Sequence, residues 1–302
     1  MMKKNILVTG TNGFLGSHIA KWLVTEHNVA GIGTSLEPSF QGLSFYRKMS
    51  LPQTELVQFL EEFNPDVVIH CAGSASVPFS LKHPEADFQA GPGLVIHILE
   101  ALRITHLHPT FIFPSSAAVY GNPATLPIRE ESPICPLSPY GHHKAVSEHI
   151  VREFETIYEI PHIILRIFSC YGIGLKKQLL WDVCQKIGSN NLELHGTGEE
   201  TRDFIHATDV ARLVAHCIEM DIKNTTMNVG SGEQTTVRKI ATLLLKNMNS
   251  DIGLQFSGLT RPGDPLHWEA DISRLKDTGF KHTISLDEGV REYTEWILSA
   301  NP

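Results

Sequence analysis

The stretch Thr9–Gly16, TGTNGFLG, follows a short apolar run and leads into a helical pattern that begins at Leu15. Its glycines, Gly10, Gly13 and Gly16, are spaced three residues apart. Glycine permits a sharp turn and lets backbone N–H groups approach a pyrophosphate, while the N-terminus of the following helix adds partial positive charge. Because a strand precedes the triplet and a helix follows it, we predict a dinucleotide-binding loop rather than an ordinary turn.

Apolar strands and helical patterns alternate outward from this loop through the first half of the chain. Strands are expected near 5–10, 28–33, 65–73, 110–116 and 162–169, and helices near 15–25, 54–63, 94–102 and 139–158. This alternation implies parallel pairing with right-handed crossovers, and strands that are apolar on both faces require helices on both sides of the sheet. We predict an α/β fold, a Rossmann-type doubly wound parallel sheet with a smaller C-terminal α/β substrate domain.

The alternation of strands and helices changes near Ser169. We expect residues 1–168 to form the dinucleotide-binding domain, with a returning segment around 203–230, and residues 169–302 to form mainly the substrate domain. Within the second part, the stretch 191–210 has the pattern of a hairpin followed by a helix start.

Composition restricts the class of protein. The 302 residues carry a formal net charge of -8, with a pI near 6.0, which argues against nucleic acid or an anionic membrane as the main partner. Five cysteines without a C-x-x-C pair indicate a reduced protein with neither a disulfide framework nor a metal site. The N-terminus runs directly into a strand, and no window approaches the length of an apolar membrane span, so we expect a cytoplasmic protein.

The second strand bears on the choice of dinucleotide. An acidic residue about 20 residues after the glycine loop typically binds the ribose 2′-OH of NAD. Here Gly33, Thr34 and Ser35 stand at that place, and Arg47 and Lys48 follow in the next strand. Nothing at this place repels a 2′-phosphate, so we expect NAD or NADP, with a slight preference for NADP.

The stretch SPYGHHK opens a helix, with Ser138 as its N-cap and Pro139 at the first helical position. Tyr140 and Lys144 are four residues apart and therefore share one helix face. A cation beside a phenol lowers the phenol pKa from about 10, which would let Tyr140 act as an acid and a base near neutral pH. A serine hydroxyl from the strand end SSAAVYG could hydrogen-bond the same substrate oxygen.

The two histidines of this stretch, His142 and His143, are neighbours about 100° apart on a helix. Both cannot point to the face of Tyr140 and Lys144, and neighbouring helical residues do not converge on one metal. We interpret them as solvent or packing contacts outside the chemistry.

The order of these motifs resembles the extended short-chain dehydrogenase/reductase family, the NAD-dependent epimerases and dehydratases of nucleotide sugars such as UDP-glucose 4-epimerase. The resemblance covers essentially the whole chain and rests on TGTNGFLG, VIHCAG, SSAAVYG, SPYGHHKAVSE, TRDFIHATDV and RPGDPLHWEAD. It implies that Tyr140 takes the proton of a sugar hydroxyl, that Lys144 bonds the nicotinamide ribose, and that Ser116 holds the substrate oxygen. Arg202 and Arg261 would bind the nucleotide diphosphate, because their planar forks match phosphate oxygens.

The resemblance also implies which residues contact each ligand. The cofactor set is Gly10, Asn12, Gly13, Phe14, Leu15, Gly16, Gly33, Thr34, Ser35, Ser50, Leu51, Cys71, Ala72, Gly73, Ser115, Tyr140, Lys144 and Phe168. The substrate set, for a nucleotide-diphosphate sugar, is Ser74, Ser116, Ser169, Arg202, Arg261 and Asp264. The family usually forms homodimers through two helices per subunit, here expected near 93–102 and 140–158.

Three positions depart from the family pattern. Ser116 is followed by Ala117 and Ala118, where 4,6-dehydratases carry an acidic pair after a threonine, so dehydratase activity is disfavoured. Two usual asparagines are replaced, one by Ser169 and one within the stretch 91–94, GPGL.

The leading hypothesis is therefore an NAD(P)-dependent sugar-nucleotide 4-epimerase that acts through a transient 4-keto intermediate. The alternative is an NADPH-dependent 4-keto sugar-nucleotide reductase, which the missing acid of the second strand favours. A non-catalytic NAD(P)-binding protein is a third possibility, but such proteins typically lose the tyrosine or the lysine, and both are present.

Overall fold

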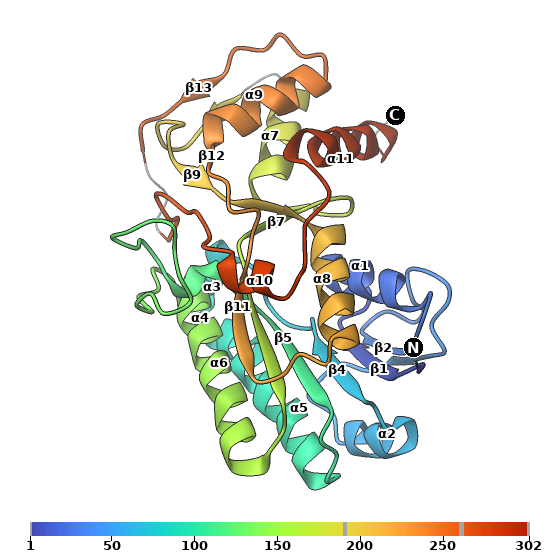
Figure 1. The fold of residues 1–302 in the computed structure, drawn as a ribbon. Helices are drawn as coiled ribbons and strands as arrows, with labels where there is room; N and C mark the ends of the chain where they lie inside the picture. Colours follow the sequence, from blue (N-terminus) through green and yellow to red (C-terminus); the bar gives the residue numbers. More distant parts are fainter. Residues whose placement is uncertain (1, 190–191, 260–262, 301–302) are drawn as a thin grey trace.

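A seven-stranded parallel sheet forms the centre of the computed structural model, which describes residues 2–189, 192–259 and 263–300 (Figure 1). Its strands, in spatial order, are β11 (Thr225–Val229), β6 (His162–Ile167), β5 (Thr110–Ser116), β4 (Val67–His70), β1 (Asn5–Thr9), β2 (Asn28–Gly33) and β3 (Phe45–Lys48). Every neighbouring pair is parallel. This order confirms the predicted doubly wound sheet of Rossmann type.

Helices cover both faces of the sheet because the side chains of each strand alternate between two apolar clusters. One cluster packs α1 (Phe14–Leu23) and α8 (Ala207–Glu219) against strand residues such as Ile6 and Val8. The opposite cluster packs α2 (Glu55–Phe63), α5 (Pro92–Ile104) and α6 (Pro139–Tyr158) against residues such as Leu7.

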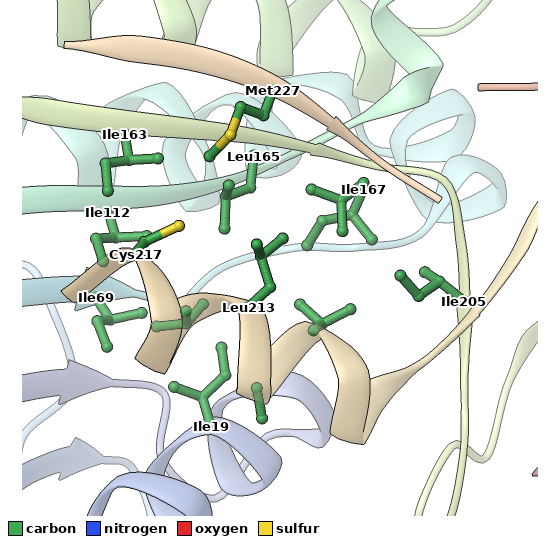
Figure 2. Close-up of a cluster of buried hydrophobic side chains, with 14 of the residues drawn as sticks. Ile19, Ile69, Ile112, Ile163, Leu165, Ile167, Ile205, Leu213, Cys217 and Met227 are labelled. Atoms are coloured by element: carbon green, nitrogen blue, oxygen red, sulfur yellow. The ribbon is translucent and has the colours of Figure 1, made fainter. Parts of the chain in front are cut away.

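Figure 2 shows the cluster beneath α8, where Leu213 and Cys217 of that helix face the strand residues Ile112 and Leu165. Ile19 of α1 lies on the other side of Leu213 in the same view. The cluster joins elements from the two halves of the chain, so α8 belongs to the core around the sheet. β11 belongs there too, since it pairs with β6 along its whole length.

The second lobe has its own apolar cluster. It is built on α7 (Gln178–Gly188), α9 (Val237–Asn247) and α11 (Leu286–Ala300), which gather at one end of the molecule in Figure 1. Short strands complete this part of the chain, namely β7 (Ser169–Tyr171), β8 (Glu193–Leu194), β9 (Thr201–Arg202), β10 (Phe204–His206), β12 (Thr235–Thr236) and β13 (Gln255–Phe256).

The predicted hairpin within 191–210 is wrong. β8 pairs with β13 in parallel, and β9 pairs with β12 in antiparallel fashion, so the two strands do not pair with each other. Their partners come from segments more than thirty residues further along the chain, which local turn signals cannot reveal. The remaining short elements are α3 (Val77–Lys82), α4 (Pro84–Ala90), the 3-10 turn η1 (Ala117–Val119) and α10 (Ser273–Asp277).

Candidate active site

The glycine loop has the geometry expected of a pyrophosphate cradle. Gly10 has a φ of +71°, and a Cβ at this position would lie 2.7 Å from the backbone nitrogen of Ala72. A Cβ on Gly16 would collide with the carbonyl oxygen of Gly10. Helix α1 begins directly after Gly13, and no side chain caps it, so its first N–H groups face the loop. Only glycines fit this close packing, which leaves backbone donors for an anionic ligand.

The loop is tied to the segment that follows β2. The Asn12 side chain donates to the carbonyl of Glu37 at 2.9 Å and to the hydroxyl of Tyr46 at 3.2 Å. The Tyr46 hydroxyl in turn donates to the carbonyl of Ser35. Tyr46 was not among the predicted cofactor residues, because it lies on β3 and only the strand pairing brings it beside Gly33.

Arg47, a candidate partner for a 2′-phosphate, is turned toward α2. Its guanidinium lies over the rings of Phe45 and Phe59 and 3.8 Å from the carboxylate of Glu62. This position gives no support to the preference for NADP. Ser50 and Leu51 follow β3, and Leu51 packs against the apolar cluster on the α2 side of the sheet.

Helix α6 begins as predicted. Ser138 is its N-cap and accepts a hydrogen bond from the backbone of Gly141, and Pro139 occupies the first turn. The backbone N–H of Tyr140 donates to the hydroxyl of Ser80 at 3.0 Å. A Cβ on Gly141 would lie 2.6 Å from the carbonyl oxygen of Ala118. The absence of a side chain at Gly141 therefore lets the start of α6 approach the turn that follows Ser116.

Ser116, Tyr140 and Lys144 are brought together by this approach. The Ser116 side chain hydrogen-bonds Tyr140, and the ammonium of Lys144 lies 6.0 Å from the centre of the Tyr140 ring. Lys144 donates to the carbonyl of Pro114 at 2.8 Å, which holds its ammonium beside the end of β5. The three predicted catalytic side chains thus converge from one strand end and one helix.

The predicted lowering of the Tyr140 pKa by Lys144 is wrong as far as the protein's own groups are concerned. Burial raises the pKa of Tyr140 to about 12, the hydrogen bond from Ser116 opposes this rise, and the charge of Asp87 adds to it. Burial also lowers the pKa of Lys144 to about 8. Loss of hydration is thus the largest influence on the pKa of both side chains.

Ser115 points away from Tyr140. Its hydroxyl donates to Glu148 at 2.6 Å, and Glu148 also pairs with the buried guanidinium of Arg166 at 2.8 Å. Arg166 reaches the hydroxyl of Tyr120 at 2.8 Å. The Ser115 side chain is thus engaged in a buried network, and only its main chain remains for the cofactor contact expected of it. Glu148 stands four residues after Lys144, so a third member of one helix face could have been noticed in the sequence.

The two histidines of α6 differ from each other. His142 is exposed, whereas His143 lies 2.6 Å from the carboxylate of Asp87 on α4. Asp87 is only 1% exposed, and its other oxygen has no hydrogen-bond partner within the described residues. His143 does not reach the reacting group, in line with the sequence interpretation, but it is more than a solvent contact because it pairs with a buried acid.

A cavity of about 600 Å³ opens beside Tyr140 and Ser116. Besides these two, four further predicted residues line it, namely Phe168, Ser169, Arg202 and Asp264. Burial lowers the pKa of Arg202, and the charges of Asp264 and Glu200 oppose this. Arg202 also lies over the ring of Trp268. This part of the cavity therefore holds a cation balanced by nearby carboxylates.

Some assignments fall elsewhere. Arg261 lies outside the described residues, and Ser74 is not among the residues that line the cavity, whereas Ser76 is. The lining residues that the sequence did not point to include Ala75, Ser76, Lys177, Trp181, His195 and Trp268. Ala75, Ser76 and Lys177 follow β4 or β7, and His195 follows β8, in segments where no periodic pattern signals an inward side chain. Trp181 lies on α7, and Trp268 precedes α10.

Comparison with known proteins decides the family. The sequence profile of the NAD dependent epimerase/dehydratase family matches residues 6–230. The chain belongs to this family. Membership confirms the resemblance drawn from the motifs, and it makes the protein an enzyme of the NAD-dependent epimerase/dehydratase type.

Proteins similar to this chain match along nearly their whole length. UDP-glucose 4-epimerase of Azospirillum brasilense is 28% identical, over 97% of this chain and 92% of its own. UDP-N-acetylglucosamine 4-epimerase from Methanobrevibacter ruminantium M1, solved with UDP-N-acetylmuramic acid, is 29% identical with a TM-score of 0.90, over 99% and 100% of the two chains. UDP-glucuronic acid 4-epimerase from Bacillus cereus, solved with UDP-glucuronic acid and NAD, is 27% identical with a TM-score of 0.89 at the same coverage.

Two features are absent from the described ranges, 2–189, 192–259 and 263–300. No helix within them combines the length and the apolar character needed to cross a bilayer. They contain no group of three or more His, Cys, Asp and Glu side chains arranged to hold a metal ion.

Proposed function

We propose that this family member is a nucleotide-sugar 4-epimerase that acts through a transient 4-keto sugar. The observation that carries the proposal is the convergence of Ser116, Tyr140 and Lys144, of which Ser116 and Tyr140 line a cavity large enough for a sugar nucleotide. Ala117 and Ala118, which follow Ser116, supply neither the acid nor the base that elimination of water requires.

The proposed chemistry begins at the C4 hydroxyl of the sugar. The Tyr140 phenolate takes the hydroxyl proton while Ser116 holds the oxygen, and C4 gives up its hydride, so that C4–O becomes a ketone. NAD, held by the glycine loop and Lys144, would supply the acceptor for this hydride and its source on return. After the keto sugar turns over in the cavity, Tyr140 gives the proton back, and C4 emerges with the opposite configuration.

We propose UDP-sugars as the substrates and NAD as the cofactor. The relatives above are named for UDP-sugars, and the Bacillus cereus enzyme was solved with NAD. The loop of Gly10 and Gly16 and the uncapped start of α1 fit a dinucleotide pyrophosphate. Lys144 would hold the nicotinamide ribose. The engagement of Arg47 with α2 favours NAD over NADP.

The test is direct conversion. The purified protein is incubated with NAD and, separately, with UDP-glucose, UDP-N-acetylglucosamine and UDP-glucuronate, and the products are separated by chromatography. We expect the C4 epimer of at least one sugar, and no product with Tyr140→Phe. Stoichiometric consumption of NADPH with a 4-keto UDP-sugar, without interconversion of epimers, would instead establish the reductase alternative.

We also propose a homodimer built on α5 and α6. These two neighbouring helices carry exposed apolar side chains, namely Ile96 and Ile104 on α5 and Val146 and Ile157 on α6. Contiguous exposed apolar groups favour association. Light scattering of the Ile104→Glu and Ile157→Glu double variant should report a monomer where the wild type is a dimer. Leu298→Glu, an exposed apolar position on α11, serves as the control and should leave the dimer intact.

A further inference from the structure

One face of α6 makes three hydrogen bonds to three consecutive residues at the end of β5. The members of this face stand four residues apart along the helix, and they are Tyr140, Lys144 and Glu148. Their partners on β5 are, in the same order, the Ser116 side chain, the Pro114 carbonyl and the Ser115 hydroxyl. The first two bonds hold the candidate catalytic groups, whereas the third reaches a carboxylate that takes no part in the proposed chemistry.

Arg166 of β6 fixes the carboxylate of Glu148 from the direction of the sheet. Both side chains are buried, with 4% of Arg166 and 1% of Glu148 exposed. Arg166 donates from Nε to Oε1 at 3.0 Å and from Nη2 to Oε2 at 2.8 Å, and such a two-pronged, charge-assisted contact is strong and directional. Arg152 of α6 adds a bond to Oε2 at 3.0 Å. On its other side, Arg166 donates to the hydroxyl of Tyr120 and the carbonyl of Glu130, both at 2.8 Å. The carboxylate therefore has a fixed position relative to β6 and to the segment after η1.

Ser115 connects this fixed carboxylate to the end of β5. In the parallel pairing of β5 with β6, Ser115 lies directly opposite Arg166. Oε1 of Glu148 accepts from both residues, and its distance of 2.6 Å from the Ser115 hydroxyl is typical of a charge-assisted O–H···O contact. The residues on either side of Ser115 make the other two bonds to α6, so a displacement of Ser115 also moves those bonds.

Stability alone does not explain a charged network at this place. A buried ion pair contributes little net stability compared with apolar side chains of similar volume, because loss of hydration offsets the attraction. The pair does provide a fixed point, since each charge must stay within bonding distance of the other. Neither Ser115 nor Glu148 is among the residues that line the cavity. Any influence of the network on the reaction therefore passes through the residues next to it.

We propose that Glu148 is a positioning residue of the active site. Through Ser115 it holds the end of β5 against α6, and it thereby fixes the distances from this strand end to Tyr140 and Lys144. The kinetic part of this inference rests on the proposed epimerase function. The geometry around Tyr140 is also measured without turnover, in the last experiment below.

The contact is tested first at Ser115, because Ser115→Ala removes the bond to Glu148 and leaves the ion pair with Arg166 in place. A misplacement of about 1 Å at reacting groups lowers the rate about 100-fold, so a partial displacement should lower kcat for an accepted UDP-sugar by about 10-fold or more. KM should change by less than about 2-fold, because the cavity wall keeps its side chains. Ser147→Ala is the matched control and should keep the wild-type kcat. Ser147 is a buried serine beside Glu148, and its hydroxyl donates to the carbonyl of His143 within α6 at 2.8 Å.

A double-mutant cycle then shows whether Glu148 acts through Ser115. Glu148→Asp keeps the charge and withdraws the carboxylate from Ser115, so it should lower kcat in the wild-type background. In the Ser115→Ala background it should cause little further loss, because the contact is already absent. Losses that multiply in the double variant would overturn the proposal. An unchanged kcat in Ser115→Ala, with only a lower unfolding free energy, would show that the network serves stability alone and would overturn it as well.

The ionisation of Tyr140 separates this inference from the proposed function. Ultraviolet difference titration in the presence of NAD compares each protein with its Tyr140→Phe counterpart and needs no turnover. The hydrogen bond from Ser116 lowers the pKa of Tyr140, so Ser115→Ala should raise the pH at which Tyr140 ionises, and Ser147→Ala should not. If the wild type converts no UDP-sugar and this shift is still seen, the epimerase proposal falls and the positioning role stands. Identical titrations of Ser115→Ala and the wild type would overturn the positioning role, whatever the activity.

Discussion

His143 pairs with the buried Asp87 across 56 residues of chain, with His143 Nδ1 lying 2.6 Å from Asp87 Oδ2. The pair joins α6, which carries Tyr140 and Lys144, to α4, which flanks its first turn. The charge of Asp87 contributes to the high pKa of Tyr140, after burial, so the pair lies within electrostatic reach of the candidate acid and base. The hydrogen bond between His143 and Asp87 is therefore expected to affect the stability of the fold and the ionisation of Tyr140.

Replacing His143 should destabilise the fold. In His143→Leu, Asp87 would remain buried with neither oxygen paired, and breaking one partner of a buried pair costs about 3 kcal/mol or more. Urea unfolding at pH 7 should report this loss. His142→Leu, at the exposed neighbouring position, should change the unfolding free energy by less than about 0.5 kcal/mol. Asp87→Leu together with His143→Leu should recover part of the loss, and equal losses in the single and double variants would contradict a coupled pair.

Gly141 is expected to be essential for turnover. A Cβ there would meet the carbonyl of Ala118 at 2.6 Å, so Gly141→Ala must push the start of α6 away from the turn after Ser116. A displacement of about 1 Å at reacting groups can lower kcat about 100-fold. Steady-state kinetics with an accepted sugar should show this fall, together with a lower unfolding free energy. His149→Ala, at an exposed polar position of the same helix, should leave kcat unchanged, and full activity in Gly141→Ala would refute the close approach.

The ionisation of Tyr140 should depend on the cofactor. Without NAD, burial holds its pKa near 12, so no phenolate of Tyr140 should form below about pH 10. A bound nicotinamide cation and the ammonium of Lys144 both favour the phenolate. Ultraviolet difference titration of the wild type minus Tyr140→Phe should therefore show an ionising phenol at lower pH with NAD than without it. Identical titration curves with and without NAD would mean that the cofactor does not activate Tyr140.

Acid should destabilise the protein through His70. This histidine is 3% exposed, lies 2.8 Å from the hydroxyl of Thr9, and has its pKa lowered to about 3, first by burial and then by the charge of Lys144. In the unfolded chain, the histidine binds a proton below about pH 6.5, whereas in the folded protein it does so only near pH 3. Stability is therefore lost as the pH falls from about 6.5 toward 3.

The size of this effect can be measured by difference. Between pH 7 and pH 5, the unfolding free energy of the wild type should fall by about 2 kcal/mol more than that of His70→Phe. The loss of the Thr9 contact lowers the unfolding free energy of His70→Phe at both pH values. It therefore cancels when the changes between pH 7 and pH 5 are compared. A His70→Phe curve parallel to the wild type would show that His70 is protonated alike in both states.

The amino-acid sequence by itself determined the features that depend on short spacings. Three glycines at intervals of three predict the loop after β1, since only glycine tolerates its backbone and its close contacts. A four-residue spacing places Tyr140 and Lys144 on one helix face, and Ser138 with Pro139 predicts where that helix starts. The alternation of strand and helix patterns predicted the parallel sheet, and the order of the motifs along the chain indicated the protein family.

Tertiary structure alone decided the electrostatics and the shape of the site. The pKa of Tyr140 rises instead of falling, because burial removes water from a phenol that the sequence shows only beside a lysine. The partner of His143, the hydroxyl partner of Ser115 and the entry of Lys177 into the cavity all join segments 33 to 102 residues apart. Hydration and long-range contact are properties of the packed chain, so the distance between residues along the sequence carries no information about them.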